Sequence, residues 1–109
     1  MAADQVQVSV DARGEWTTVT ISGVLDAASL TDVSKALTDA QRDSTPVYID
    51  LESVSFMDSR GLGVLLAANE RGREGGALVY IYRPSEAVRR LLDVSGVRRV
   101  LEEAGELPG

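Results

Sequence analysis

The 109-residue sequence contains no cysteine and no histidine. Without cysteine the chain has no disulfide framework, no thiol nucleophile and no zinc-thiolate site. Without histidine it cannot by itself supply a Ser-His-Asp triad, a histidine phosphorelay or a histidine metal ligand. Only carboxylate or metal-carboxylate chemistry is left for an enzyme, and the candidate acidic residues, Asp26 and Asp58, are too few to argue such a site. We therefore expect a non-enzymatic protein with no cofactor and no bound metal.

Positive charge is also scarce. The chain carries 11 lysine and arginine residues against 17 aspartate and glutamate residues, which gives a net charge of −6. A protein that neutralises nucleic-acid phosphates needs the opposite balance, so we expect no direct contact with DNA or RNA. The longest apolar stretch, Val64-Leu65-Leu66-Ala67-Ala68, is too short to span a bilayer, and Met1 to Gln5 lack the pattern of a secretory signal. We therefore expect a cytoplasmic protein that does not contact the membrane.

Alternating residues near the N-terminus predict a hairpin of two strands. Val6, Val8 and Val10 alternate with polar residues, which is the period of a half-buried strand. Residues 11–15 have turn composition, and residues 16–22 then alternate again, with Thr17, Val19 and Ile21 on one face and Trp16, Thr18, Thr20 and Ser22 on the other.

The rest of the chain alternates between helical and strand-like segments. We expect helices from about Ser29 or Thr31 to Ala40, over 60–74, from Pro84 onward and over 97–104, and strands over 47–51, extended by 54–56, and over 77–82, the last buried on both faces. The order β-β-α-β-α-β-α-α predicts a single α/β domain over residues 1–109. It has a mixed sheet of about four strands with helices packed on it, and a flexible tail over about 105–109.

The run Met57-Asp58-Ser59-Arg60-Gly61-Leu62-Gly63 lies where a strand is expected to pass into a helix. A helix N-terminus presents unpaired amides and the positive end of the helix dipole, so it favours phosphate or another anion. Asp58 and Ser59 are also good N-cap residues. The simplest alternative is therefore that they only cap the helix, while Gly61 and Gly63 allow close packing against the sheet.

Four segments in the same order resemble the STAS-domain family of bacterial anti-sigma-factor antagonists, in which the junction reads Asp-Ser-(Ser or Thr)-Gly-Leu-Gly. Together they cover most of the chain. They are Ile21-Ser22-Gly23-Val24-Leu25-Asp26, the strand Val47 to Leu51 with its continuation Val54 to Met57, the junction itself, and the helical segment Val88 to Val97.

The resemblance implies a STAS-type fold and a function in partner switching. In this family the unphosphorylated antagonist binds an anti-sigma factor, often a serine/threonine kinase with an ATP-binding fold, and so frees a sigma factor that directs transcription. Phosphorylation of the antagonist by the kinase then releases it. The resemblance assigns partner binding to Asp26, which matches an acidic position near the phosphosite, and to the junction residues Asp58, Ser59, Arg60, Gly61, Leu62 and Gly63.

Arg60 departs from this pattern, because it occupies the position of the family's phosphoacceptor and has no hydroxyl. One interpretation is an antagonist that phosphorylation cannot switch off. A second is that Ser59 has become the acceptor, although one step along a helix rotates the side chain by about 100°. A third is a changed partner with an acidic group opposite Arg60. The simplest is a surface arginine neutralised by Asp58.

A second function stays open beside partner switching. A STAS domain can also serve as a regulatory subunit of a transporter-associated or stress-signalling complex, and the sequence does not separate the two. We expect the chain to be a monomer or a weak dimer.

Overall fold

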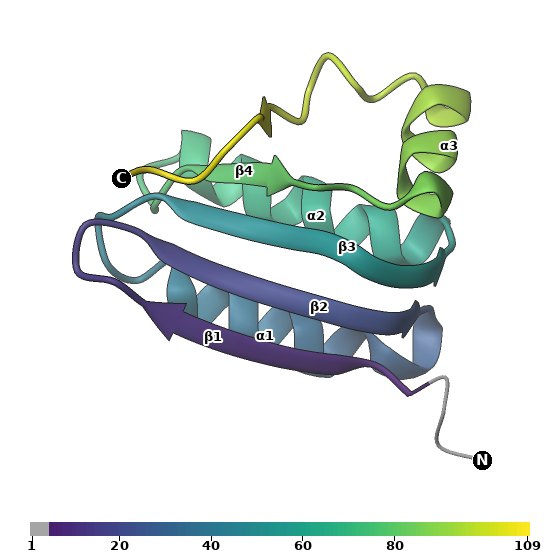
Figure 1. Cartoon of the computed structure of the whole chain (residues 1–109), viewed down its shortest axis with the longest axis horizontal. Coiled ribbons are helices and arrows are strands. Elements are labelled where there is room, and N and C mark those ends of the chain that lie inside the picture. Colours follow the sequence, from purple (N-terminus) through teal and green to yellow (C-terminus); the bar gives the residue numbers. More distant parts are fainter. Residues whose placement is uncertain (1–4) are drawn as a thin grey trace.

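The computed structural model describes residues 5–109, and its core element is a five-stranded sheet with strand order β1-β2-β3-β4-β5 (Figure 1). The expectation that no secretory signal is present concerns mainly residues 1–4, which lie outside this range. In chain order the elements are β1 (Gln7–Ala12), β2 (Thr17–Leu25), the 3₁₀ turn η2 (Ala27–Ser29), α1 (Leu30–Ala40), β3 (Val47–Met57), α2 (Ser59–Arg73), β4 (Val79–Tyr82), α3 (Glu86–Ser95) and β5 (Glu103–Ala104).

The sheet is mixed, as the sequence predicts. Strands β1 and β2 form the antiparallel hairpin, and β3, β4 and β5 each pair in parallel with the preceding strand. Parallel neighbours need a crossover connection, which α1 and α2 supply for β2 to β3 and β3 to β4. The single-domain α/β class is therefore confirmed.

The core lies between the sheet and its helices: α1 and α2 cover the same face of the sheet (Figure 1), and α3 contributes the buried Val88 and Leu92. Thr17, Val19 and Ile21 of β2 are buried there, which confirms the predicted alternation. The opposite face carries the half-buried Tyr48 and Tyr80, whose rings stack with centroids 5.1 Å apart.

The C-terminal part of the chain differs from the sequence-based expectation. The predicted helix over 97–104 is wrong: residues 97–102 form a turn with irregular chain around it. The chain then adds β5, so the sheet has five strands rather than about four. The apolar residues Val97, Val100 and Leu101 have helical spacing, but the segment instead pairs with β4. Ile81 N donates a hydrogen bond to the carbonyl of Glu102 at 2.8 Å.

Two smaller predictions near β4 also fail. Leu78 is 52% exposed and β4 begins only at Val79, so residues 77–82 are not a strand buried on both faces. Pro84 precedes helix α3 instead of lying in its first turn. The N-cap is Ser85, whose hydroxyl accepts a hydrogen bond from Val88 N at 3.3 Å.

The end of the chain lies beside the single tryptophan. A Cβ placed on Gly109 would be 3.4 Å from Cη2 of Trp16. The flexibility of the tail over 105–109 stays a prediction. Across residues 5–109, none of the helices combines the length and the apolarity that crossing a membrane requires.

Candidate functional site

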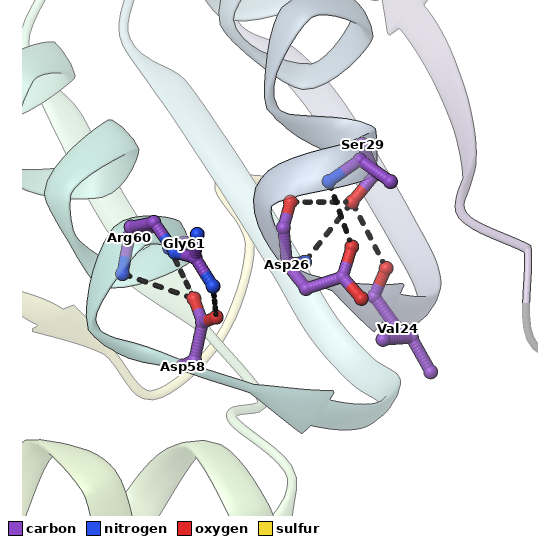
Figure 2. A network of polar contacts seen from close by, with 7 residues as sticks. Val24, Asp26, Ser29, Asp58, Arg60 and Gly61 are labelled. Atoms are coloured by element: carbon purple, nitrogen blue, oxygen red, sulfur yellow. Dashed lines mark hydrogen bonds and ion pairs between the residues drawn. The ribbon is translucent and has the colours of Figure 1, made fainter.

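The candidate site lies where β2 and β3 end side by side. Leu25 and Met57 are register partners at the carboxyl ends of these parallel strands, and Asp58 N donates to the carbonyl of Leu25 at 3.4 Å. Asp26 and Asp58 are the next residues after their strands, so the fold brings them to one edge of the sheet (Figure 2). The sequence could single out both residues, but only the parallel register makes them neighbours.

Asp58 is the N-cap of α2. Its Oδ1 accepts hydrogen bonds from Arg60 N at 3.0 Å and from Gly61 N at 3.1 Å. The bond from Gly61 N, followed by the hydrogen bonds and the charge of Arg60, holds the pKa of Asp58 below its usual value, although partial desolvation acts in the opposite direction. The carboxylate therefore already accepts hydrogen bonds from two amides at the helix N-terminus, where a phosphate could otherwise bind.

Arg60 folds back onto the same carboxylate. Its Nη2 lies 3.1 Å from Oδ2 of Asp58, and 65% of the Arg60 side chain is exposed, compared with 23% of the Asp58 side chain. The simplest of the four interpretations, an ion pair with Asp58, is thus present in the structure. The exposed guanidinium can also reach an acidic group of a partner, since an exposed pair of this kind is held only weakly.

Asp26 lies in a turn that is closed by its own neighbours. Oδ1 of Asp26 accepts from Ala28 N at 3.0 Å, and the Ser29 hydroxyl oxygen accepts from Asp26 N at 3.1 Å. The Ser29 hydroxyl hydrogen faces the carbonyls of Val24 and Asp26, at 3.0 and 3.1 Å (Figure 2). This reciprocal capping box fixes the turn that carries Asp26.

The remaining predicted site residues divide by burial. Ser59 and Gly63 are exposed, whereas Gly61 is buried and Leu62 is only 4% exposed. A Cβ on Gly61 would lie 2.6 Å from the carbonyl oxygen of Leu25, so a glycine is required for the close approach of α2 to β2. Gly63 has no atom within 4 Å of such a Cβ, so the idea that it allows close packing is wrong.

Phe56 is a surface residue of this edge that sequence reasoning missed. It is 51% exposed, two residues before Asp58 and in register with Val24. Val54 and Met57, on either side of Phe56 in the strand, are both buried, so the alternation of buried and exposed side chains is interrupted at the end of β3. This interruption was the available signal that Phe56 lies at the surface. Exposed aromatic rings are common anchors in protein interfaces.

These features give the edge the properties of a docking surface. It presents an exposed guanidinium, an exposed aromatic ring and two carboxylates that are held by backbone amides, all on the ends of ordered elements. Within residues 5–109, no cluster of three or more aspartate or glutamate side chains gathers to form a metal site. Groups of this kind can take part in recognition of another macromolecule through charge and shape.

Residues 8–103 match the family model described as Mlab, STAS domain. The chain belongs to the STAS-domain family. An anti-sigma-B factor antagonist from Staphylococcus aureus is 26% identical to this STAS domain over 97 residues, which cover 88% of the chain and 90% of that relative.

Solved structures agree with this assignment. An anti-sigma factor antagonist from Mycobacterium paratuberculosis matches this STAS domain with a TM-score of 0.82 and 25% identity, over 95% of the chain and 89% of that structure. The Bacillus cell fate determinant SpoIIAA in its phosphorylated form matches with a TM-score of 0.69 and 22% identity, over 92% and 93% of the two chains. The second likeness supports the fold alone.

Proposed function

We propose that this STAS domain is an anti-sigma factor antagonist, which binds an anti-sigma factor at the edge formed by the ends of β2 and β3 and thereby releases a sigma factor. The observation that carries the proposal is the pairing of Leu25 with Met57, which places Asp26 beside the Asp58 junction on one accessible edge. The names of relatives that align over most of the chain supply the class of partner.

The side chains have different roles in this proposal. Asp26, Ser59, Arg60 and Gly63 are accessible to a partner, and Phe56 adds apolar contact area. Gly61 and Leu62 act from below the surface, because they hold the first turn of α2 against the sheet. The inferred partner is a serine/threonine kinase with an ATP-binding fold, as the family resemblance implies.

Arg60 is the reason to infer that phosphorylation does not control this protein in the usual way. A serine/threonine kinase transfers phosphate to a hydroxyl, which a guanidinium lacks, and here the guanidinium neutralises the Asp58 carboxylate. Ser59 is exposed and carries the hydroxyl nearest to the switch position in the sequence, so modification at Ser59 is the alternative that an experiment has to separate.

Binding is tested by titrating the purified protein into each anti-sigma factor of its own cell and measuring heat or fluorescence. We expect at least one complex with a Kd of about 1 μM or tighter. Asp26→Lys should weaken that complex at least about tenfold, whereas Glu74→Lys, at the far end of α2, should leave it unchanged. Circular dichroism of both variants checks that the fold is retained. If the protein binds none of the anti-sigma factors, the proposal is contradicted.

The switch is tested with the kinase that binds. We expect the wild-type protein to keep its intact mass after incubation with kinase and ATP. Arg60→Ser should gain one phosphate, and its affinity for the kinase should fall, because about two added negative charges would lie beside Asp58. Phosphate on wild-type Ser59 would show that the acceptor has moved. If Arg60→Ser binds but gains no phosphate, the partner is not a kinase of this type.

Arg60 also favours a second candidate function, because a STAS domain without a phosphoacceptor suits a permanent assembly. In that case the chain is a regulatory subunit of a transporter-associated or stress-signalling complex. Affinity purification from native cells followed by mass spectrometry separates the two. Recovery of a soluble kinase-fold protein supports the antagonist, and recovery of membrane permease or ATPase subunits supports the regulatory subunit.

A further inference from the structure

A second surface of the molecule, away from the β3–α2 junction, has the form of a groove. It runs between β1 and α1 and has a volume of about 630 Å³. The valines of β1, including Val8 and Val10, contribute its floor, and Ala36 and Ala40 of α1 contribute its wall. We call it the β1–α1 groove.

The groove exists because α1 covers the apolar side of β1 only in part. Val10 and Val19 are register partners on β1 and β2, yet Val19 is fully buried and Val10 is 50% exposed. The same contrast holds for Val8, which is half-buried, and its partner Ile21, which is fully buried. Helix α1 contacts both β1 and β2, yet it leaves Val10 and part of Val8 uncovered.

The rim of the groove is acidic. Asp32, Asp39 and Asp43 line it from the α1 side, and Lys35 is the one cation among its lining residues. Asp39 is partly neutralised by Arg42 at 3.5 Å, whereas Asp32 and Asp43 form no ion pair within residues 5–109. An apolar floor between unpaired carboxylates complements a segment with apolar residues on one side and lysine or arginine next to them.

We propose that the β1–α1 groove receives an amphipathic helix of a partner protein, with an apolar face on Val8 and Val10 and basic residues opposite Asp32 and Asp43. A helix is favoured over a strand because Ala36 and Ala40, spaced by one helical turn, allow a neighbouring helix to approach closely. The 11 residues of α1 give the groove a length of roughly 16 Å, which is about three turns of a bound helix.

The groove is continuous with the edge that carries the candidate site. A second hollow of about 540 Å³ shares Val6 and Asp32 with the groove and reaches Asp26 and Ser29. One partner can therefore occupy the Asp26 turn and the groove together. The groove proposal itself does not depend on which protein binds the junction, and its test uses no anti-sigma factor.

The probe is a synthetic helix of about four turns, with leucines along one face and lysines on both flanks. Its control is the same peptide with glutamates in place of the lysines. Titrating each into isotope-labelled protein and following amide chemical shifts locates the binding site. We expect the lysine peptide to shift amides of β1 and α1, to become helical by circular dichroism, and to bind more tightly than the glutamate peptide.

Matched charge variants separate the groove from general attraction to an acidic protein. Asp32→Asn combined with Asp43→Asn should weaken the lysine peptide about fivefold, since two surface charge pairs are lost. Glu70→Asn combined with Glu74→Asn removes the same charge from α2 and should leave the affinity unchanged. Equal weakening by both pairs, shifts outside β1 and α1, or equal binding of both peptides would overturn the proposal.

Two other occupants would also show themselves in these measurements. If the peptide extends the sheet, β1 amides gain protection from hydrogen exchange while the peptide stays non-helical. If a second copy of the chain fills the groove, the same amides shift with protein concentration alone and sedimentation shows a dimer. Either result would overturn a partner helix as the occupant.

Discussion

The two turns that come after β2 and β3 begin alike and end differently. Each begins with an aspartate, Asp26 or Asp58, whose carboxylate accepts hydrogen bonds from backbone amides and caps the helical residues that follow it in the chain. In the first turn the Ser29 hydroxyl oxygen accepts a hydrogen bond from Asp26 N, and this bond closes the turn on itself. In the second turn the exposed Arg60 reaches back to Asp58, and the buried Gly61 lets α2 approach the sheet.

The difference shows that an N-cap residue alone does not make a recognition site. The residues after the cap decide whether the turn is a closed structural element or presents a charge to solvent. The β2 turn uses a buried hydroxyl to fix its backbone, and the β3 turn uses a glycine against the sheet and leaves an exposed ion pair outside. Substitutions in the two turns test this distinction, from the largest expected effect to the smallest.

The largest effect is expected at the glycine that allows α2 to approach the sheet. Gly61→Ala places a Cβ 2.6 Å from the Leu25 carbonyl oxygen, which is backbone and cannot rotate away. We expect the free energy of unfolding to fall by about 1–3 kcal/mol. Gly63→Ala is the control, because its Cβ meets open space inside the same helix, and it should raise stability by about 0.5–1 kcal/mol. Urea unfolding measures both, and a similar loss in the two variants would contradict the packing argument.

The next effect distinguishes the two serines. Ser29 is buried, and its hydroxyl oxygen accepts a hydrogen bond from Asp26 N. Ser29→Ala removes this bond and should lower the free energy of unfolding by about 1–2 kcal/mol. Ser59 is exposed at the first position of α2, and Ser59→Ala should change stability by less than about 0.5 kcal/mol. Equal losses would show that the β3 turn is as closed as the β2 turn.

A third prediction concerns pH and Asp58. The folded-state pKa of Asp58 is lowered, so the unfolded chain binds this proton first as the pH falls from neutral. The stabilising contribution is therefore complete above the unfolded value, about 3.9, and is lost as the pH falls through the lower folded value. Unfolding midpoints measured from pH 6 downward should drop more steeply for the wild type than for Asp58→Asn. Parallel curves would contradict the assignment.

The smallest effect is expected from Arg60. Arg60→Ala removes an exposed ion pair and also an unfavourable cation from a helix N-terminus, so the two contributions to stability oppose each other. We expect little change in the unfolding midpoint. The pKa of Asp58, followed by carboxyl NMR, should rise but stay below its usual value, because the bond from Gly61 N remains. A return of the Asp58 pKa to its usual value would show that Arg60 causes the whole lowering.

The local pattern was sufficient for much of the fold. The alternation of Thr17, Val19 and Ile21 placed β2 correctly, and the order of strands and helices predicted a mixed α/β sheet. Asp58 as a helix cap could be predicted from residue type and position alone. The prediction of a helix over 97–104 is wrong because periodicity does not indicate whether a neighbouring strand is available for pairing. The end of this segment pairs with β4 and forms β5.

By itself, the sequence determined which side chains are available for chemistry. It excludes cysteine and histidine, and it supplies the two capping aspartates and an arginine in place of a hydroxyl. Tertiary structure alone decided which of them meet and which are accessible. Parallel pairing of Leu25 with Met57 brought Asp26 and Asp58 to the same edge of the sheet, and burial took Leu62 off the surface. Because α1 covers β1 only in part, Val10 stays exposed in the floor of the groove, between the acidic residues of its rim. The reason is physical: backbone propensity and side-chain type act over a few residues, whereas register and burial depend on contacts between segments far apart in the chain.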